Sequence, residues 1–259
     1  MKPKVLILKA DGINRDEEMA YAFKIAGGDP KIVHVNELRN GRERLSNYNI
    51  LALPGGFAYG DDIVSGKILA IELISFLGNE MKKFIKREDT AIIGVCNGFQ
   101  VLVRTGLLPF RKIGQMQVTL TNNDSGHFEC RWVNLKVEKS KCKFSEGLIG
   151  SKIFYPIAHG EGKFITDAET LKEIEDQGLV VFRYSDEKGN PTMEYPKNPN
   201  GALNSIAGIC DVSGRILGLM PHPECFVRKE QHPNFRRGKV KVDGLPLIEN
   251  IIKFVKGAK

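Results

Sequence analysis

Residues 91–100 read AIIGVCNGFQ: an apolar run, then Cys96 between Gly94 and Gly98, then the start of a helical stretch. A strand that passes into a helix through G-x-C-x-G matches the nucleophile-elbow pattern, with cysteine as the nucleophile. Glycines on both sides let the chain turn sharply, and the N–H groups at the start of a helix favour the thiolate. An isolated cysteine would more often be an unreactive buried thiol. The pattern as a whole predicts that Cys96 is reactive.

Strands and helices alternate on both sides of this segment. Apolar runs predict strands at residues 4–9, 31–35, 49–53 and 90–95, and helical periodicity predicts helices at residues 16–26 and 67–86. This order predicts an α/β fold in which a mostly parallel sheet is covered by helices on both faces. In such sheets function gathers at the carboxyl ends of the strands, which is where Cys96 would lie.

The second half of the chain has a different pattern. Residues 115–155 alternate between polar and apolar side chains, which predicts antiparallel additions to the sheet, and residues 205–220 predict a hairpin. A predicted helix at residues 245–256 closes the chain, and residues 188–201 are expected to form a surface loop. We expect a single domain over residues 1–259, because one domain commonly reaches this length.

The composition is that of an ordinary globular protein. Hydrophobic residues make up 42% and charged residues 27%, which excludes a disordered or membrane-embedded chain. The N-terminus lacks the long apolar core of a secretory signal, so we expect a cytoplasmic protein with no membrane association. Five cysteines without a C-x-x-C pair argue against both a disulfide framework and a zinc site, and we expect no bound metal.

The formal net charge of +7 raises the question of nucleic-acid binding. The notable basic cluster is Arg236, Arg237, Lys239 and Lys241, and it has little aromatic interleaving. A solvated basic surface is the expected role of such a cluster, so we expect no nucleic-acid partner. Binding of nucleic acid through these four residues is kept as an alternative hypothesis.

Residues 220–224 read MPHPE and follow the second strand of the predicted hairpin. His222 and Glu224 are two residues apart, so both side chains can face one site. A carboxylate can hold an imidazole in one tautomer while the imidazole exchanges protons with a thiol. His159, in AHGEG, is the rival base. The alternative for His222 and Glu224 is a loop histidine beside a solvent-facing carboxylate.

Residues 53–57 read LPGGF and follow another predicted strand. Glycine there lets the backbone approach a ligand and offer N–H donors, as an oxyanion hole requires. Pro-Gly-Gly taken alone would be an ordinary turn. Its position, at the end of a strand that should lie near Cys96, makes it a candidate part of the same site.

Together PGG, G-x-C-x-G-x-Q and H-P-E resemble the class I, or triad, glutamine amidotransferases, and the resemblance covers nearly the whole chain. It implies the three-layer flavodoxin-like fold of that family and hydrolysis of glutamine to glutamate and ammonia. The likeness is closest to the glutaminase subunits of purine biosynthesis, and residues 53–62, 94–100, 123–132 and 156–164 carry it. Residues 225–243 are longer than the family's compact ending.

The resemblance also implies roles for individual residues. Cys96 would be the nucleophile, with His222 and Glu224 completing the triad. The backbone N–H groups of Gly56 and Asn97 would form the oxyanion hole. The implied glutamine-binding residues are Gln100, Asn123, Ser125 and Phe128.

Use of the ammonia in synthesis would need other proteins. The chain contains neither a G-x-x-x-x-G-K-[ST] nor a G-x-G-x-x-G motif for binding phosphates. The resemblance implies a large synthetase subunit, which uses ATP and Mg²⁺, and a small accessory subunit. This chain itself is expected to need no cofactor. A cysteine hydrolase or peptidase of the same superfamily is the alternative function.

Overall fold

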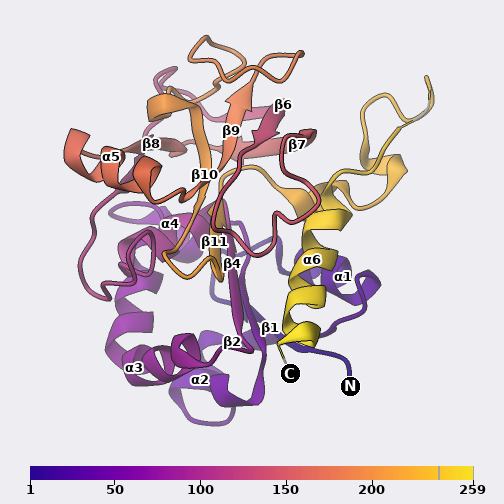
Figure 1. Ribbon diagram of the computed structural model, residues 1–259. Helices are drawn as coiled ribbons and strands as arrows, with labels where there is room; N and C mark the ends of the chain where they lie inside the picture. Colours follow the sequence, from indigo (N-terminus) through magenta and orange to yellow (C-terminus); the bar gives the residue numbers. More distant parts are fainter. Residues whose placement is uncertain (239, 259) are drawn as a thin grey trace.

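The computed structural model describes residues 1–238 and 240–258, and its main feature is a nine-stranded sheet (Figure 1). The strands of this sheet are β1 (Lys4–Lys9), β2 (Asp29–His34), β3 (Ile50–Leu53), β4 (Ala91–Val95), β6 (Glu129–Val137), β7 (Lys152–His159), β9 (Val180–Ser185), β10 (Ile206–Cys210) and β11 (Ile216–Leu219). Their order in the sheet is β2-β1-β3-β4-β11-β10-β9-β6-β7. Two further strands, β5 (Thr119–Thr121) and β8 (Lys163–Ile165), form a separate pair.

The α-helices are α1 (Asp16–Ile25), α2 (Val35–Arg39), α3 (Lys67–Lys86), α4 (Asn97–Arg104), α5 (Ala168–Asp176) and α6 (Gly244–Gly257). Short 3-10 turns are η1 (Leu45–Asn47), η2 (Ala58–Asp61), η3 (Leu203–Ser205), η4 (Pro223–Phe226) and η5 (Lys229–Gln231). No helix in the described part of the chain combines the length and the apolar character that a membrane crossing would need.

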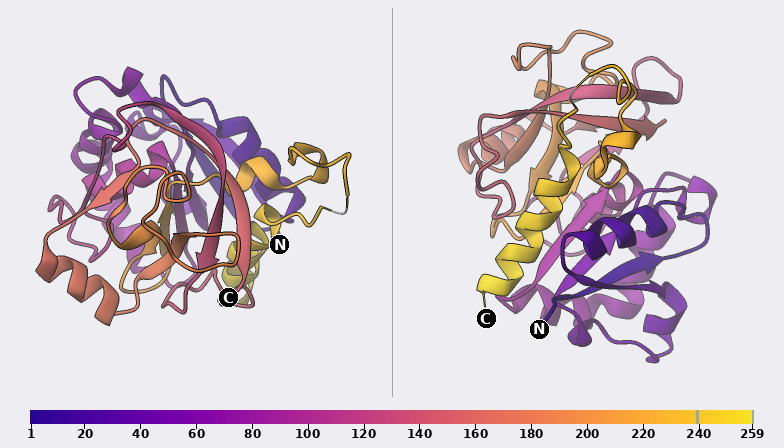
Figure 2. Two further views of the ribbon diagram at one scale, coloured as in Figure 1. Left: turned by 90° about the horizontal axis from the view of Figure 1, so that it is seen from above. Right: turned by 90° about the vertical axis from the view of Figure 1, so that its right-hand side faces the viewer.

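The first half of the sheet is parallel. β2, β1, β3, β4 and β11 are parallel neighbours, and every residue of β3, β4 and β11 is buried. Complete burial is expected for strands that are covered on both faces. Figures 1 and 2 show α1 and α6 on one side of these strands and α3 with α4 on the other. This arrangement confirms the predicted three-layer α/β fold.

The second half of the sheet is antiparallel and extends the first without a break. β11, β10, β9, β6 and β7 pair in antiparallel fashion, which confirms the predicted antiparallel additions. Neither α5 nor β9 was expected from the sequence. That residues 1–259 form one domain stays a prediction, and the continuous sheet supports it.

The prediction of a surface loop at residues 188–201 is wrong for its last part. Asn198 and Asn200 are buried. The Asn198 amide donates to the carbonyl oxygen of Ala202 at 3.0 Å, and the Asn200 amide donates to the carbonyl oxygen of Gly162 at 2.8 Å. These bonds offset the desolvation cost that keeps most loops at the surface.

Close packing explains the two glycines around Cys96. The sequence suggested that they relieve a sharp turn, but neither Gly94 nor Gly98 has a positive φ angle. A Cβ atom on Gly98 would lie 2.0 Å from the carbonyl oxygen of Leu53, and one on Gly94 would lie 2.5 Å from the carbonyl oxygen of Gly98. Both positions therefore need glycine so that α4 can lie directly against β3 and β4.

Candidate active site

Cys96 occupies the junction between β4 and α4. Its φ angle is 52° and its ψ angle is −109°, a combination that non-glycine residues rarely adopt and that marks local strain. The backbone N–H of Cys96 donates to the carbonyl oxygen of Leu219 at 2.8 Å, which ties the turn to β11. The side chain is 5% exposed, and its thiol donates to the carbonyl oxygen of Ala158 at 3.6 Å.

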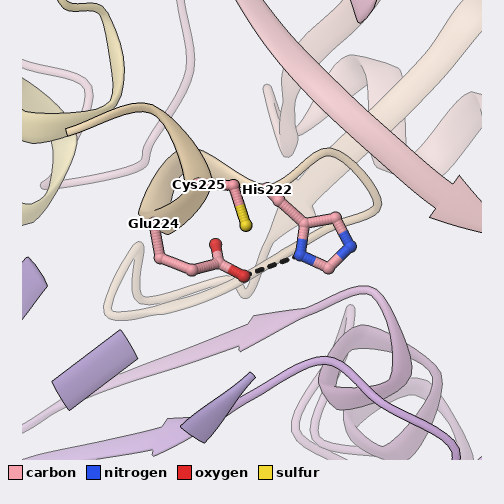
Figure 3. Close-up of side chains that lie close together, drawn as sticks. All are labelled: His222, Glu224 and Cys225. Atoms are coloured by element: carbon pink, nitrogen blue, oxygen red, sulfur yellow. Dashed lines mark hydrogen bonds and ion pairs between the residues drawn. The ribbon is translucent and has the colours of Figure 1, made fainter. Parts of the chain in front are cut away.

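His222 and Glu224 follow β11, the parallel neighbour of β4, so they leave the sheet at the same edge as Cys96. The backbone N–H of His222 donates to the carbonyl oxygen of Pro156 at 2.9 Å. Nδ1 of His222 lies 2.6 Å from Oε1 of Glu224 (Figure 3). Both side chains are buried. The alternative of an exposed loop histidine with a solvent-facing carboxylate does not describe this pair.

The pKa of His222 is raised to about 10. Burial lowers it, but the negative charge of Glu224 and the nearby Cys96 side chain outweigh burial. The imidazole therefore holds a proton at neutral pH. Within the described chain its Nε2 atom has no partner of good hydrogen-bond geometry, and one carboxylate oxygen of Glu224, Oε2, is also buried without a partner. A protonated imidazole beside a thiol favours the thiolate.

The Pro-Gly-Gly segment lies against the imidazole. A Cβ atom on Gly55 would lie 2.6 Å from Cε1 of His222, so only glycine fits at this position. Gly56 has a φ angle of 149° and bridges to Ile13. The backbone N–H groups of Gly56 and Asn97, as far as the described chain goes, donate to no acceptor. These are the two donors that the sequence assigned to an oxyanion hole.

The side chains of Asn97 and Gln100 are buried and bonded to each other. Nδ2 of Asn97 donates to Oε1 of Gln100 at 3.0 Å and to Oδ1 of Asp61 at 2.9 Å. Oδ1 of Asn97 accepts from the N–H of Ala58 at 3.2 Å, and Nε2 of Gln100 donates to the carbonyl oxygen of Glu161 at 2.6 Å. The two amides thereby hold the loops after β3 and β7 against α4.

Asn123 is also buried, and its amide holds neighbouring loop segments together. Its Nδ2 donates to the carbonyl oxygens of His127 at 2.9 Å and His159 at 2.8 Å. Its Oδ1 accepts from the N–H of Gly162 and faces Nδ1 of His159, both at 3.1 Å. Direct contact of Gln100 and Asn123 with glutamine stays a prediction, and both amides already serve the fold.

Ser125, which is half-buried, and Phe128, which is exposed, lie on the same loop. The hydroxyl of Ser125 accepts from the N–H of His127 at 3.3 Å. Phe128 is 51% exposed, and its ring centroid lies 6.1 Å from that of Phe57, which follows the Pro-Gly-Gly segment. The two rings connect the loop after β3 with the loop before β6, so a ligand entering here would meet an apolar surface.

His159, the rival base, lies at the end of β7. Its pKa is lowered to about 3 by burial and by the positive charge of His222. No carboxylate pairs with it in the described residues, because Nδ1 faces the Asn123 amide. His222, which has the carboxylate partner, fits the role of base better.

Arg15 and Cys225 also lie at this site, and no local sequence signal marks either residue. The N–H of Arg15 donates to the carbonyl oxygen of Gly55 at 3.2 Å. Burial lowers the pKa of its guanidinium, but the carboxylates of Glu18 and Glu224 raise it overall. The pKa of the Cys225 thiol is raised by burial and by the charge of Glu224, so Cys225 stays protonated. Cys225 is therefore not expected to act as a second nucleophile.

The donor atoms of His222, Glu224 and Cys225 lie within 4.8 Å of one another, which is close enough for a metal ion (Figure 3). The chemistry of the set opposes this role. Nδ1 of His222 is already engaged by Glu224, Cys225 keeps its proton, and the cationic Arg15 is nearby. These side chains fit a hydrogen-bonded arrangement better than a metal centre.

The long segment at residues 225–243 packs onto the sheet through His232. The ring of His232 lies 5.5 Å from Trp132, 5.6 Å from Phe154 and 5.4 Å from Phe226, measured between centroids. Arg236 and Arg237 are exposed beyond this anchor, whereas Lys239 lies outside the described residues. The anchor connects the segment to η4, which carries Glu224.

Comparison with known families gives a match over nearly the whole chain. Residues 2–255 match the CobB/CobQ-like glutamine amidotransferase domain. The chain is 45% identical over 258 residues to the phosphoribosylformylglycinamidine synthase subunit PurQ of Dehalococcoides mccartyi, and the match covers 98% of both chains. A protein of the same name from Treponema denticola is 44% identical over 240 residues, or 86% of this chain and 88% of that one.

Solved structures also match nearly the whole chain. A chain in the structure of PurLQS from Thermotoga maritima matches with a TM-score of 0.76 and 32% sequence identity, covering 98% of this chain and 99% of that one. A putative GMP synthase protein from Thermoplasma acidophilum has a TM-score of 0.59 at 14% identity, with 99% and 96% of the two chains covered. The second match is evidence for the fold alone.

Proposed function

The chain belongs to the CobB/CobQ-like glutamine amidotransferase family, and we propose that it is the glutaminase subunit of a phosphoribosylformylglycinamidine synthase. It hydrolyses glutamine to glutamate and delivers ammonia to a synthetase subunit. That subunit converts formylglycinamide ribonucleotide to formylglycinamidine ribonucleotide in purine biosynthesis. The observation that carries the proposal is Cys96 at a strained strand-to-helix turn, beside the buried His222–Glu224 pair.

In the proposed reaction the Cys96 thiolate attacks the carboxamide carbon of glutamine. His222 gives its proton to the departing nitrogen, which leaves as ammonia, and a thioester remains on Cys96. Water then adds to the thioester carbon and passes a proton to His222, the C–S bond breaks, and glutamate leaves. Glu224 holds the imidazole through Nδ1, which leaves Nε2 for proton exchange with the thiol and the substrate.

The oxyanion of each tetrahedral intermediate is assigned to the backbone N–H groups of Gly56 and Asn97. The support is that both donors are free of partners within the described chain. Donors fixed in place before the reaction stabilise developing charge without reorganisation. Asn97 is held by the bonds of its side chain to Asp61 and Gln100, which keeps its backbone in position.

The substrate's α-amino and carboxylate groups are assigned to the loop that carries Asn123, Ser125 and Phe128, together with Gln100. Phe128 is exposed and Ser125 is half-buried, so both can meet a ligand directly. The Gln100 amide uses one donor and one acceptor position within the described chain, so one of each is left for a ligand. The Asn123 amide uses both donors and both acceptor positions, so its proposed contribution is to hold the loop in place.

The proposed partners are the subunits that would use the ammonia in synthesis. Relatives are named as subunits, and the Thermotoga maritima structure is of PurLQS. We propose that a large synthetase subunit binds ATP and Mg²⁺, that a small accessory subunit completes the complex, and that this chain needs no cofactor. Ammonia would pass through the subunit interface, because water would protonate it. The complex is assigned to the cytoplasm.

The test is reconstitution of the complex with a Cys96→Ala chain. Glutamine-dependent synthesis should fall by at least about 1,000-fold, because no thioester can form. Synthesis from added ammonium salt should continue, because the synthetase site is intact. Cys130→Ser is the matched control, since Cys130 is an exposed thiol on β6 and should leave both activities unchanged.

Loss of both activities in the Cys96→Ala complex would argue against this assignment. Release of product from other amides or from peptides, without glutamate from glutamine, would favour the cysteine hydrolase alternative.

A further inference from the structure

His159 carries a buried nitrogen atom that the reaction described above does not use. The side chain is 2% exposed, and Nε2 has no hydrogen-bond partner among the described residues. An unsatisfied buried polar atom destabilises the folded state, so such atoms are rare without a role. His159 adjoins the candidate site, because it directly follows Ala158, whose carbonyl oxygen accepts from the Cys96 thiol.

The hydrogen bonds of Asn123 fix the tautomer of His159. The Asn123 amide nitrogen donates to two carbonyl oxygens, those of His127 and His159, so the amide cannot be turned around. Its oxygen therefore faces Nδ1 of His159 at 3.1 Å and must receive a proton from it. With Nδ1 protonated in a neutral ring, Nε2 is left as a lone pair.

Packing holds this ring in one orientation. A Cβ atom on Gly162 would lie 2.2 Å from Cε1 of His159, so glycine at this position admits the ring. The loop between His159 and Gly162 is held against α4 by the hydrogen bond from Nε2 of Gln100 to the carbonyl oxygen of Glu161. The acceptor at Nε2 is thereby preorganised.

The end of β7 runs along the reactive groups. The carbonyl oxygen of Pro156 accepts from the N–H of His222, and that of Ala158 accepts from the thiol of Cys96. His159 is the next residue of the strand. The backbone of His159 therefore directly follows the residue that contacts the thiol, and both His159 and His222 are buried with an Nε2 atom free of partners in the described chain.

We propose that His159 is a further catalytic residue, whose Nε2 accepts a hydrogen bond first from the leaving ammonia and then from the water that replaces it. The proposal rests on the glutaminase function proposed above. Ammonia and water occupy one position in turn, because water attacks the thioester from the side on which nitrogen left. A water molecule that donates one hydrogen to His159 and the other to His222 has its lone pairs directed to the thioester carbon.

Bonds and protons balance in the hydrolysis of the thioester. The water oxygen bonds to the thioester carbon, His222 takes one proton, the C–S bond breaks and Cys96 is regenerated. His159 takes no proton, which its lowered pKa of about 3 supports. A neutral acceptor can hold ammonia without converting it to ammonium, and only neutral ammonia is a nucleophile for the synthetase.

Two substitutions separate this role from a structural one. In His159→Asn the amide nitrogen takes the place of Nδ1, so the bond to Asn123 is kept and the acceptor at Nε2 is lost. In His159→Gln the amide oxygen reaches the place of Nε2, so the acceptor is kept and the bond to Asn123 is lost. Both chains are measured in the reconstituted complex, with glutamate release and with acid-quenched single turnovers.

We expect His159→Asn to reduce kcat about 10- to 100-fold, the usual effect of losing one positioned hydrogen-bonding group. The thioester on Cys96 should accumulate in the quenched samples, and hydroxylamine, a stronger nucleophile than water, should restore turnover. His159→Gln should retain more activity than His159→Asn. The reverse ranking, or a His159→Asn chain with normal turnover and no thioester, would overturn the inference.

Glutamate release by the wild-type complex distinguishes an error in the role of His159 from an error in the proposed glutaminase function. Absence of glutamate release from glutamine by the wild-type complex would remove the glutaminase assignment and this inference together. Normal release by both wild type and His159→Asn would remove only the role of His159.

Discussion

Nδ1 of His222 lies 2.6 Å from Oε1 of Glu224, and both side chains are buried. Glu224→Gln would remove the charge that raises the pKa of His222 while keeping the size of the side chain. We expect kcat/KM for glutamine to fall about 100- to 10,000-fold, because the imidazolium loses its partner. Steady-state glutamate release measures this.

Glu249→Gln is the matched control, since Glu249 is exposed on α6 and should be neutral. If Glu224→Gln retained wild-type kcat/KM, the carboxylate would have no role in the reaction.

The two buried histidines should give the folded protein a stability maximum near pH 6.5. His222 has a folded-state pKa of about 10 against 6.5 in the unfolded chain, so its contribution is complete below about pH 6.5 and is lost as the pH rises to 10. His159 has a folded-state pKa of about 3, so the unfolded chain alone binds its proton between pH 6.5 and 3, and stability falls as the pH falls.

Urea unfolding across this pH range measures the free energy of unfolding of wild type and of each variant. The difference between wild type and a variant isolates the contribution of one histidine, since the other groups titrate alike in both chains. His159→Asn should flatten the acid side of the profile, and Glu224→Gln should flatten the alkaline side. Parallel profiles for wild type and both variants would show that the histidines titrate normally.

Two helical glycines should respond to alanine in opposite directions. A Cβ atom on Gly98 would lie 2.0 Å from the carbonyl oxygen of Leu53, whereas one on Gly78 in α3 would meet nothing within 4 Å. Gly98→Ala should reduce the free energy of unfolding by about 1–3 kcal/mol or more through overpacking. Gly78→Ala should raise it by about 0.5–1 kcal/mol, because alanine loses less backbone entropy in a helix. Chemical denaturation measures both, and equal effects would contradict the packing argument.

The ring of His232 should control exposure of the segment at residues 225–243. Its contacts with Trp132, Phe154 and Phe226 are aromatic, and each such pair contributes about 0.5–1.5 kcal/mol. His232→Ala should make tryptic cleavage at Arg236 and Arg237 about tenfold faster, because the segment opens more often. His232→Phe keeps a ring and should stay near the wild-type rate. Equal cleavage of the alanine variant and wild type would show that the anchor lies elsewhere.

Local patterns were sufficient for the parallel half of the fold. The helix expected at residues 67–86 is α3 with the same bounds, because its buried residues recur at helical spacing. The missed elements also carry local signals. Asp167 caps α5 through the N–H of Thr170 at 2.8 Å, and β9 is a largely apolar run. Antiparallel partners are harder to assign, since β9 pairs with β10, the next strand of the chain, but also with β6, from which β7 and β8 separate it in sequence.

The candidate site was predictable where its residues share a segment. His222 and Glu224 are two residues apart, and their spacing alone suggests a common direction. Asn123 and His159 are 36 residues apart and meet only because of how the strands are arranged. The same holds for Arg15 beside Gly55. Strand order decides these contacts, and no local periodicity encodes it.

β11 is inserted between β4 and β10, and it is completed at Leu219. The thiol-bearing strand is synthesised more than a hundred residues before its neighbour, so a nascent or truncated chain has the nucleophile without its imidazole. Such fragments would be unable to consume glutamine. The site is therefore assembled late, only when the segment that contains β11 and the residues after it docks beside β4.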